Sequence, residues 1–109
     1  MKQVKYSILI PTFNKFEYLN YTLKSILQND YEDFEVIVSN DHSTDGTDEL
    51  LLKIKDPRVK IIKPPFKLTQ AKNYEYLLNF ANGEWISILG DDDGVLPNFF
   101  QTLDKLIKS

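Results

Sequence analysis

Apolar and polar residues come in alternating blocks along this chain. Short runs rich in β-branched and aromatic residues are typical of buried strands, whereas apolar residues spaced three and four apart are typical of a helix with one buried side. Strands are expected at residues 4–10, 34–38, 58–62 and 84–89. Helical spacing follows each of them, at residues 15–28, 47–55 and 69–81 and from Pro97 onward.

Turn and capping residues mark the ends of the predicted elements. Pro11 is expected to stop the first strand, because proline cannot donate to the hydrogen-bond ladder of a sheet. Asn14 is predicted to cap the first helix, and Thr44 or Asp45 the second. The dipeptide at residues 82–83, Asn-Gly, is expected to end the third helix, since both residue types tolerate a left-handed conformation.

Strands that alternate with helices through short connections form parallel sheets with right-handed crossovers. We therefore predict an α/β fold, a Rossmann-like three-layer α/β/α arrangement with a mostly parallel sheet, in a single domain of residues 1–109. In such a sheet, ligands bind beyond the carboxyl ends of the strands. The polar segments at residues 12–14, 40–45 and 91–93 follow three of the predicted strands. Residues far apart in the sequence are thus expected to line one crevice.

Composition narrows the possible partners. The net charge of −3 and the pI near 5.1 argue against a nucleic-acid partner, which usually requires a basic patch. The sequence contains no cysteine, so disulfide and thiolate chemistry are excluded. No apolar run approaches the roughly 20 residues of a membrane span, and the N-terminus does not resemble a signal peptide. A cytoplasmic location is expected on these grounds.

Three consecutive carboxylates, at residues 91–93, follow the last predicted strand. Adjacent carboxylates repel one another, and a cation relieves that repulsion. Mg²⁺ and Mn²⁺ prefer oxygen ligands of this kind, and a phosphate is their natural second partner. An Asp-Asp-Gly sequence can also form an ordinary tight turn. The residues alone therefore leave a metal site and a simple turn as equal alternatives.

The second polar segment, residues 40–45, contains one candidate binding residue and others that fit structural roles. Asp41 directly follows a buried strand, where its carboxylate could accept hydrogen bonds from a nucleobase or a ribose. Asp45 fits better as a cap, and His42, the only histidine, fits a solvated loop position. Three lysines near the third crossover fit either a diphosphate-binding role or an exposed helix face; they are Lys63, Lys67 and Lys72.

Two related α/β classes do not fit. Phosphatases of the haloacid dehalogenase type carry Asp-x-Asp-Gly-Thr after their first strand, but here Asp45-Gly46-Thr47 follows the second strand and the nearest upstream aspartate is Asp41. A receiver domain needs an acidic pair after strand one and a phosphoacceptor aspartate after strand three. The first strand here leads into Thr12-Phe13-Asn14, and the third leads into Lys63-Pro64.

Taken together, the segments resemble the family 2 glycosyltransferases of the GT-A fold. The resemblance rests on the order and spacing of pieces spread over nearly all of the chain: residues 7–14, 31–38, 41–47, 71–73 and 83–93. Each piece alone is weak, and the ordered set is specific.

The resemblance implies roles for particular residues. Pro11, Thr12 and Asn14 would belong to the nucleotide-binding set, with Pro11 and Thr12 against the nucleoside. Asp41 would bind the base, usually uracil, and Lys72 would lie near the diphosphate. The acidic loop completes the implied set, with Asp91 at the ribose and Asp92 as the ligand of a divalent cation, Mn²⁺ or Mg²⁺.

The implied reaction transfers a sugar from a nucleotide-diphosphate donor, a UDP-sugar being expected, to an acceptor hydroxyl with inversion. Family members continue well past the acidic loop, so we expect this chain to be the donor- and metal-binding half of a longer enzyme, inactive alone and without a catalytic residue of its own. The acceptor, a saccharide or a lipid-linked sugar, would bind the remaining part, at the inner face of the membrane.

Two features depart from the family pattern, and two other classes stay open. Gly90 stands where an aspartate is common, and Asn40 and His42 replace the usual Asp and Gly beside Asp41. A non-catalytic nucleotide-binding α/β domain is the main alternative. A sugar-nucleotide nucleotidyltransferase fits less well, because that class favours a glycine-rich basic loop after strand one, and Pro11-Thr12-Phe13-Asn14 is not one.

Overall fold

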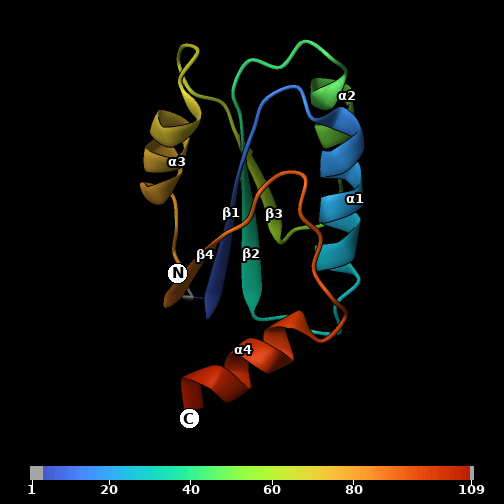
Figure 1. The fold of residues 1–109 in the computed structure, drawn as a ribbon, viewed down its shortest axis with the longest axis vertical. Helices are drawn as coiled ribbons and strands as arrows, with labels where there is room; N and C mark the ends of the chain where they lie inside the picture. The colour runs from blue at the N-terminus through green and yellow to red at the C-terminus, as the bar shows by residue number, and fades with distance from the viewer. Residues whose placement is uncertain (1–3, 109) are drawn as a thin grey trace.

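Strands and helices alternate strictly in the computed structural model, which describes residues 4–108 (Figure 1). In chain order the elements are β1 Tyr6–Thr12, α1 Phe16–Leu27, β2 Phe34–Asn40, α2 Thr47–Leu52, β3 Val59–Ile62, α3 Gln70–Leu78, β4 Trp85–Ile88 and α4 Phe99–Lys108. Every predicted strand and helix is present, and the predicted α/β class is confirmed.

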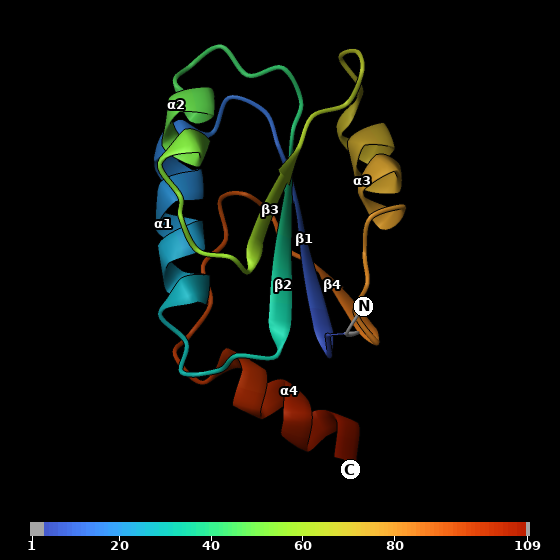
Figure 2. The ribbon, with the colours of Figure 1, turned by 180° about the vertical axis from the view of Figure 1, so that it is seen from behind.

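The four strands form one parallel sheet in the order β3-β2-β1-β4. The two central strands, β1 and β2, pair along their whole length, from Tyr6 opposite Phe34 to Thr12 opposite Asn40. Helix α3 covers one face, and α1 and α2 cover the other (Figures 1 and 2). The carboxyl ends of the strands lie at the top of Figure 1, and α4 lies across the opposite end of the sheet.

The central strands are buried on both faces, because successive side chains point to opposite sides of a strand. Ile8 and Ile10 of β1 belong to the larger apolar cluster, together with Leu19 and Leu23 of α1. Leu9, between them in sequence, packs on the other side with two partners, Ile37 and Leu77. A continuous apolar run in β1 and β2 thus reflects a sheet covered on both faces.

The expectation that Pro11 ends the first strand is wrong. Strand β1 continues through Pro11 to Thr12, and these residues pair with Ser39 and Asn40 of β2. Along a strand, the backbone groups of successive residues point to opposite neighbouring strands. The Leu9 carbonyl accepts from the Leu89 amide on the β4 side, and Pro11, two residues later, faces the same side. Because β4 pairs only as far as Leu9, the missing N–H of Pro11 breaks no ladder bond.

The predicted caps of the first two helices are also corrected. Asn14 does not cap α1. It adopts a left-handed φ of 51°, and its Oδ1 accepts a hydrogen bond from the Thr44 amide at 2.7 Å. Asp45 fills that role from the next loop, since its Oδ2 accepts from the amide of Phe16 at 3.0 Å. Gly46, with a φ of 99°, occupies the N-cap position of α2, while Asp45 Oδ1 accepts from the amide of Thr47, the first residue of that helix, at 3.2 Å. The loops after β1 and β2 are therefore tied together.

The connection from α3 to β4 requires glycine for a reason other than the predicted one. Helix α3 ends at Leu78, and Gly83 does not have a positive φ. A Cβ at Gly83 would lie 2.5 Å from the backbone nitrogen of Ser7 on β1, closer than real atoms approach. Its amide donates to Ser7 Oγ at 2.7 Å. Gly83 thus allows the chain to pass against β1.

A buried carboxylate organises the same region. Glu35 of β2 is 3% exposed and accepts hydrogen bonds from Ser7 Oγ at 2.6 Å, Lys60 Nζ at 2.7 Å and the amide of Asn82 at 2.7 Å. Burial would raise the pKa of Glu35, but the donors from Lys60, Ser7 and Asn82 outweigh it and the pKa is lowered. Glu35 therefore joins three strands to the turn that enters β4.

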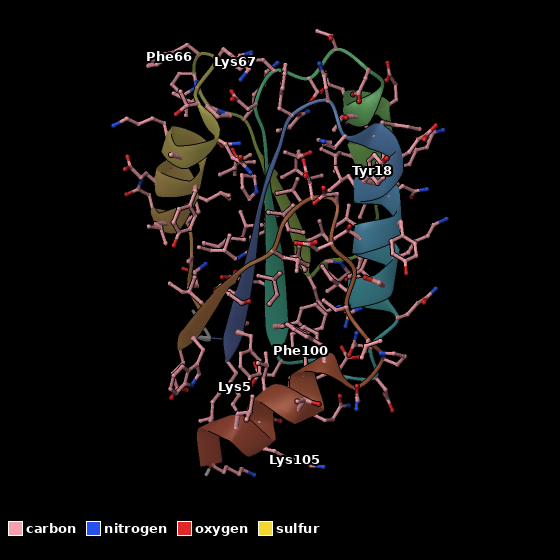
Figure 3. All side chains as sticks on the ribbon, in the orientation of Figure 1. Lys5, Tyr18, Phe66, Lys67, Phe100 and Lys105 are labelled. Atoms are coloured by element: carbon pink, nitrogen blue, oxygen red, sulfur yellow. The ribbon has the colours of Figure 1, made fainter. Side chains whose placement is uncertain are left out.

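Helix α4 is attached by charge and by stacked rings. Asp104 accepts from Lys5 Nζ at 2.7 Å, from the Tyr6 hydroxyl at 2.6 Å and from the Tyr31 hydroxyl at 3.0 Å. Phe100 of the same helix stacks on Phe34, with ring centroids 4.3 Å apart. Figure 3 shows Phe100 and Lys5 together at this end of the molecule, far from the loops at the opposite end.

The outer strand β4 keeps much apolar surface exposed among the described residues. Trp85, Ile86 and Ile88 are each 45–49% exposed. Across residues 4–108, no helix combines the length and the apolar character that crossing a bilayer requires.

Candidate nucleotide-binding site

A pocket opens at the carboxyl ends of the central strands, as the fold predicts. Its volume is about 230 Å³, and the loops after the four strands together with the start of α3 form its walls. The lining residues are Pro11, Thr12, Phe13, Lys15, Asp41, Lys67, Gln70, Asn73 and Asp91. Four predicted site residues, Pro11, Thr12, Asp41 and Asp91, are thus brought together from three separate stretches of sequence.

Asp91 lies at one side of the pocket and is held by β1 and α1. Its Oδ2 accepts a hydrogen bond from Thr12 Oγ1 at 2.9 Å, and its backbone carbonyl accepts from Thr22 Oγ1 at 3.0 Å. Burial raises the pKa of Asp91, the Thr12 hydroxyl opposes that effect, and the negative charge of Asp92 adds to the increase. A cation or a hydrogen-bond donor placed here would stabilise the ionised carboxylate.

Asp41 lies at another side of the pocket and is 2% exposed. The amide of Leu68 donates to both of its oxygens, at 3.0 and 3.1 Å, and Lys67 Nζ donates to Oδ2 at 2.9 Å. The Lys67 ammonium also lies 4.1 Å from the centroid of the Phe13 ring. A carboxylate, a cation and an exposed aromatic ring therefore meet at one end of the pocket.

The first turn of α3 is fixed to the sheet by a buried amide. Asn73 is 2% exposed, and its Oδ1 accepts a hydrogen bond from the hydroxyl of Ser39 on β2. Its Nδ2 donates to the Ser39 carbonyl at 3.1 Å. Thr69 is the N-cap of this helix, and its side chain accepts a hydrogen bond from the Lys72 amide. The helix was expected to start at this residue. These contacts set the position of the pocket wall that α3 supplies.

Three predicted site residues lie outside the pocket lining. Asn14 joins the loops after β1 and β2, donating its amide to Ser43 Oγ at 3.0 Å. Lys72 has a side chain 67% exposed, with its Nζ 3.5 Å from Glu75. Asp92 follows the buried Asp91 and is itself exposed.

The side chains of the acidic loop fit a cation only in part. Within residues 4–108, no group of three or more His, Cys, Asp or Glu side chains is arranged to enclose a metal ion. Asp91 offers a hard oxygen ligand in the pocket, and the exposed Asp92 next to it in sequence offers another. Mg²⁺ commonly takes one or two carboxylates, with the remaining positions filled by water and phosphate. The donor set therefore fits a cation held jointly with a diphosphate.

Five pocket residues were not predicted as site residues: Phe13, Lys15, Lys67, Gln70 and Asn73. Phe13 and Asn73 are adjacent to predicted residues, and that adjacency was the available signal. For Lys67 the sequence is compatible with a diphosphate-binding role or an exposed helix face. His42, expected to be solvated, instead has its Nε2 2.9 Å from the Pro64 carbonyl and links the loops after β2 and β3.

Comparison with known proteins decides the family. The family model described as "Glycosyl transferase family 2" matches residues 7–109. The chain belongs to this family. The predicted resemblance is thereby confirmed, and with it the general class of glycosyltransferases.

Two relatives of this glycosyltransferase chain come from bacteria. The "GalNAc(5)-diNAcBac-PP-undecaprenol beta-1,3-glucosyltransferase" of Campylobacter jejuni is 35% identical over 91% of this chain and 33% of its own length. "Glycosyltransferase GlyG" of Streptococcus pneumoniae is 34% identical over 94% of this chain and 35% of its own length. The chain therefore spans about a third of the length of these curated relatives.

Several solved structures have the same fold. TarS 1-349 of S. aureus matches with a TM-score of 0.87 and 26% identity, over 95% of this chain and 32% of that one. Its complex with UDP-GlcNAc matches with a TM-score of 0.86 at 25% identity, over 95% and 31%. The mannosyltransferase PcManGT of Pyrobaculum calidifontis, solved with GDP-Man and Mn²⁺, matches with a TM-score of 0.82 at 23% identity, over 99% and 32%. The last likeness concerns the fold alone.

Proposed function

We propose that this chain is the donor-binding part of an inverting glycosyltransferase that uses a UDP-sugar and a divalent cation. The observation that carries the proposal is the pocket in which Thr12, Asp41 and Asp91 converge at the carboxyl ends of β1, β2 and β4. Membership of glycosyl transferase family 2 supports it, and so does the fold shared with a structure solved with UDP-GlcNAc.

Each side chain is proposed for a defined part of the donor. Pro11 and Thr12 lie against the nucleoside, Asp41 accepts a hydrogen bond from the base, and Asp91 accepts from the ribose. Lys72 is a long, exposed side chain on the first turn of α3 and is proposed to reach the diphosphate. Asn14 contributes by holding the loops after β1 and β2 together.

The acidic loop is proposed to hold the cation and the leaving group. Asp92, supported by Asp91, would ligate Mn²⁺ or Mg²⁺ together with diphosphate oxygens. When bound, the cation supplies Lewis-acid stabilisation of the negative charge that develops on the leaving nucleoside diphosphate. Inversion requires a base that takes the acceptor proton on the opposite face of the sugar. We assign that base to no residue of this chain.

The acceptor is proposed to bind outside residues 1–109, because the chain spans about a third of its relatives. A saccharide linked to a lipid diphosphate is the acceptor class that we propose, since the Campylobacter relative is named for an undecaprenol-diphosphate substrate. Such an acceptor would bring the enzyme to the inner face of the membrane.

Calorimetry with UDP on the intact protein tests the proposal. Mn²⁺ is expected to tighten UDP binding by about tenfold or more, because the cation joins Asp92 to the diphosphate. Asp92→Asn should abolish this Mn²⁺ dependence. Asp93→Asn is the matched control and should keep the Mn²⁺ dependence. Asp93 closes a turn with Gly90, whose carbonyl accepts a hydrogen bond from the Asp93 amide at 3.1 Å. Equal UDP–Mn²⁺ affinity in Asp92→Asn and the parent would refute the metal assignment.

A further inference from the structure

The loop between β3 and α3 places a lysine beside the buried carboxylate of the pocket. Lys67 Nζ lies 2.9 Å from Asp41 Oδ2, 2.7 Å from the Leu68 carbonyl and 4.1 Å from the centroid of the Phe13 ring. Figure 3 shows Lys67 on this loop, at the end of the molecule where the strands have their carboxyl ends. An ammonium group only donates hydrogen bonds, and an ionised carboxylate only accepts them.

The two charged groups differ in how firmly they are held. Asp41 is 2% exposed, and the amide of Leu68 contacts both of its oxygens, so backbone fixes its direction. Lys67 has a side chain 49% exposed on a flexible stem. This end of the pocket therefore presents a fixed acceptor with an adjustable donor next to it.

We infer that Lys67 is a specificity-determining residue that, paired with Asp41, selects nucleotides whose base carries a ring N–H beside a carbonyl oxygen. The ring N–H donates to Asp41, and the neighbouring carbonyl accepts from Lys67. Uracil and guanine present this pair on their Watson–Crick edges. Cytosine and adenine present the opposite pair, an acceptor ring nitrogen beside an amino group. The inference rests on the proposed function, in which this pocket holds a nucleoside diphosphate.

The recorded contacts of Lys67 favour a role at the base over a role at the phosphates. Its partners are Asp41, the Leu68 carbonyl and the face of Phe13. Asp91, which leads into the acidic loop, is held instead by Thr12. The Lys67 ammonium lies over the Phe13 ring, so a base that stacks on that face must displace it, and the half-exposed lysine stem allows such a movement. The displaced ammonium and Asp41 would then both lie at the edge of the base.

The wrong base leaves two mismatches in the same place. The ring nitrogen of cytosine directs a lone pair at the Asp41 carboxylate, and its amino group directs N–H bonds at the Lys67 ammonium. A buried charged group that loses its partner costs more free energy than an ordinary hydrogen bond contributes. Sites built to pair with a particular polar group reject analogues without it for this reason.

The affinities of UDP and CDP in the intact protein test the inference, because the two ligands differ only at the base. The parent is expected to bind UDP at least about tenfold more tightly than CDP. Lys67→Met keeps the length of the stem and removes the donor, so it should reduce this preference to about threefold or less. Lys72→Met is the matched control. It removes a lysine proposed to act on the diphosphate, so it should weaken UDP and CDP alike and leave the preference unchanged.

Other results would overturn the inference. A parent that binds UDP and CDP equally does not select the base in this way. If Lys67→Met weakens both ligands equally, Lys67 acts on the phosphates, and if it tightens UDP, Lys67 blocks the pocket instead of reading the base. A parent that binds neither nucleotide, with or without Mn²⁺, refutes the proposed function itself.

Discussion

Asp91 is a buried carboxylate whose ionised form is stabilised chiefly by one hydroxyl. Thr12 Oγ1 donates to it at 2.9 Å across 79 residues of sequence. Burial raises the pKa of Asp91, and the hydrogen bond from Thr12 opposes that increase. The pocket thus contains an acidic group that gains stability from any donor or cation that enters, which is the property that a ligand-binding residue needs.

Thr12→Val is expected to lower the free energy of unfolding by about 1–3 kcal/mol at pH 7, because it removes the side-chain donor of a buried carboxylate. Thr12→Ser keeps the hydroxyl and should cost less. The Thr12 hydroxyl stabilises the ionised form, so the difference between these variants should shrink as Asp91 is protonated at acid pH. Urea unfolding of both variants from pH 7 down to about pH 4 measures it, and a pH-independent difference would contradict the explanation.

The sequence indicates some of these site residues and not others. Asp41 and Asp91 directly follow predicted strands, so the rule for open α/β sheets places them in one crevice. The contact between Thr12 and Asp91 depends on the pairing of β1 with β4, which residue patterns do not specify. The position of Lys67 depends on the path of an irregular loop with two prolines, Pro64 and Pro65, where no periodicity exists to guide a prediction.

Elements are more predictable than their ends. Strands and helices follow from apolar periodicity, and every predicted one is present. Their limits depend on neighbours that the pattern does not name: β1 extends through Pro11 because β4 is short, and α1 receives its cap from Asp45 in the next loop. Helix α2 ends at Leu52, earlier than predicted. Local residue preference and tertiary contact therefore act together at each boundary.

Among the contacts between elements, those of Glu35 have the clearest expected effect on stability. Glu35→Gln is expected to lower the free energy of unfolding by about 2 kcal/mol at pH 7, because an amide NH₂ would face the donors of Ser7 and Asn82. Lys60→Met is the comparison variant at the 51% exposed end of the same ion pair. It leaves the donors of Ser7 and Asn82 in place and should cost less than Glu35→Gln. The pKa of Glu35 is lowered on folding, so its contribution should be lost as pH falls through that pKa.

Urea unfolding of the two variants and hydrogen exchange of the Asn82 and Gly83 amides measure this effect. Both amides donate into the Glu35 network, at 2.7 Å in each case. Exchange should accelerate at these two amides in Glu35→Gln and remain near the parent rate in Lys60→Met. Equal destabilisation by the two variants would show that the ion pair, and not the buried network, supplies the stability.

At the scale of the whole molecule, the carboxyl ends of the strands and the attachment of α4 are located at opposite ends of the sheet (Figure 1). The pocket lies beyond the carboxyl ends of the strands, whereas α4 packs where they begin, around Phe34 and Tyr6. The central strands β1 and β2 contribute to both ends. Changes at α4 are therefore expected to alter stability without altering the geometry of the pocket.

Asp104→Asn is expected to lower the midpoint of thermal unfolding by a few degrees at pH 7 and to leave UDP affinity unchanged. The hydrogen bond from Lys5, followed by that from Tyr6, lowers the pKa of Asp104 to about 2. A carboxylate with a lowered pKa stabilises the fold above its unfolded-state pKa, and the contribution disappears as pH falls from about 4 toward about 2.

Differential scanning calorimetry of parent and variant across that range, with UDP titrations at pH 7, checks both expectations. A weaker affinity for UDP in Asp104→Asn would mean that the two ends of the sheet are coupled.

The two outer strands differ in what they offer to another chain. Strand β3 carries Lys60, whose charge discourages further strand pairing, whereas Trp85, Ile86 and Ile88 leave β4 apolar and half exposed. Unpaired apolar edges act as templates for aggregation unless something covers them. Left uncovered, β4 would be expected to associate with another copy of the chain through that edge. A nucleotide titration of this chain would then include a contribution from self-association.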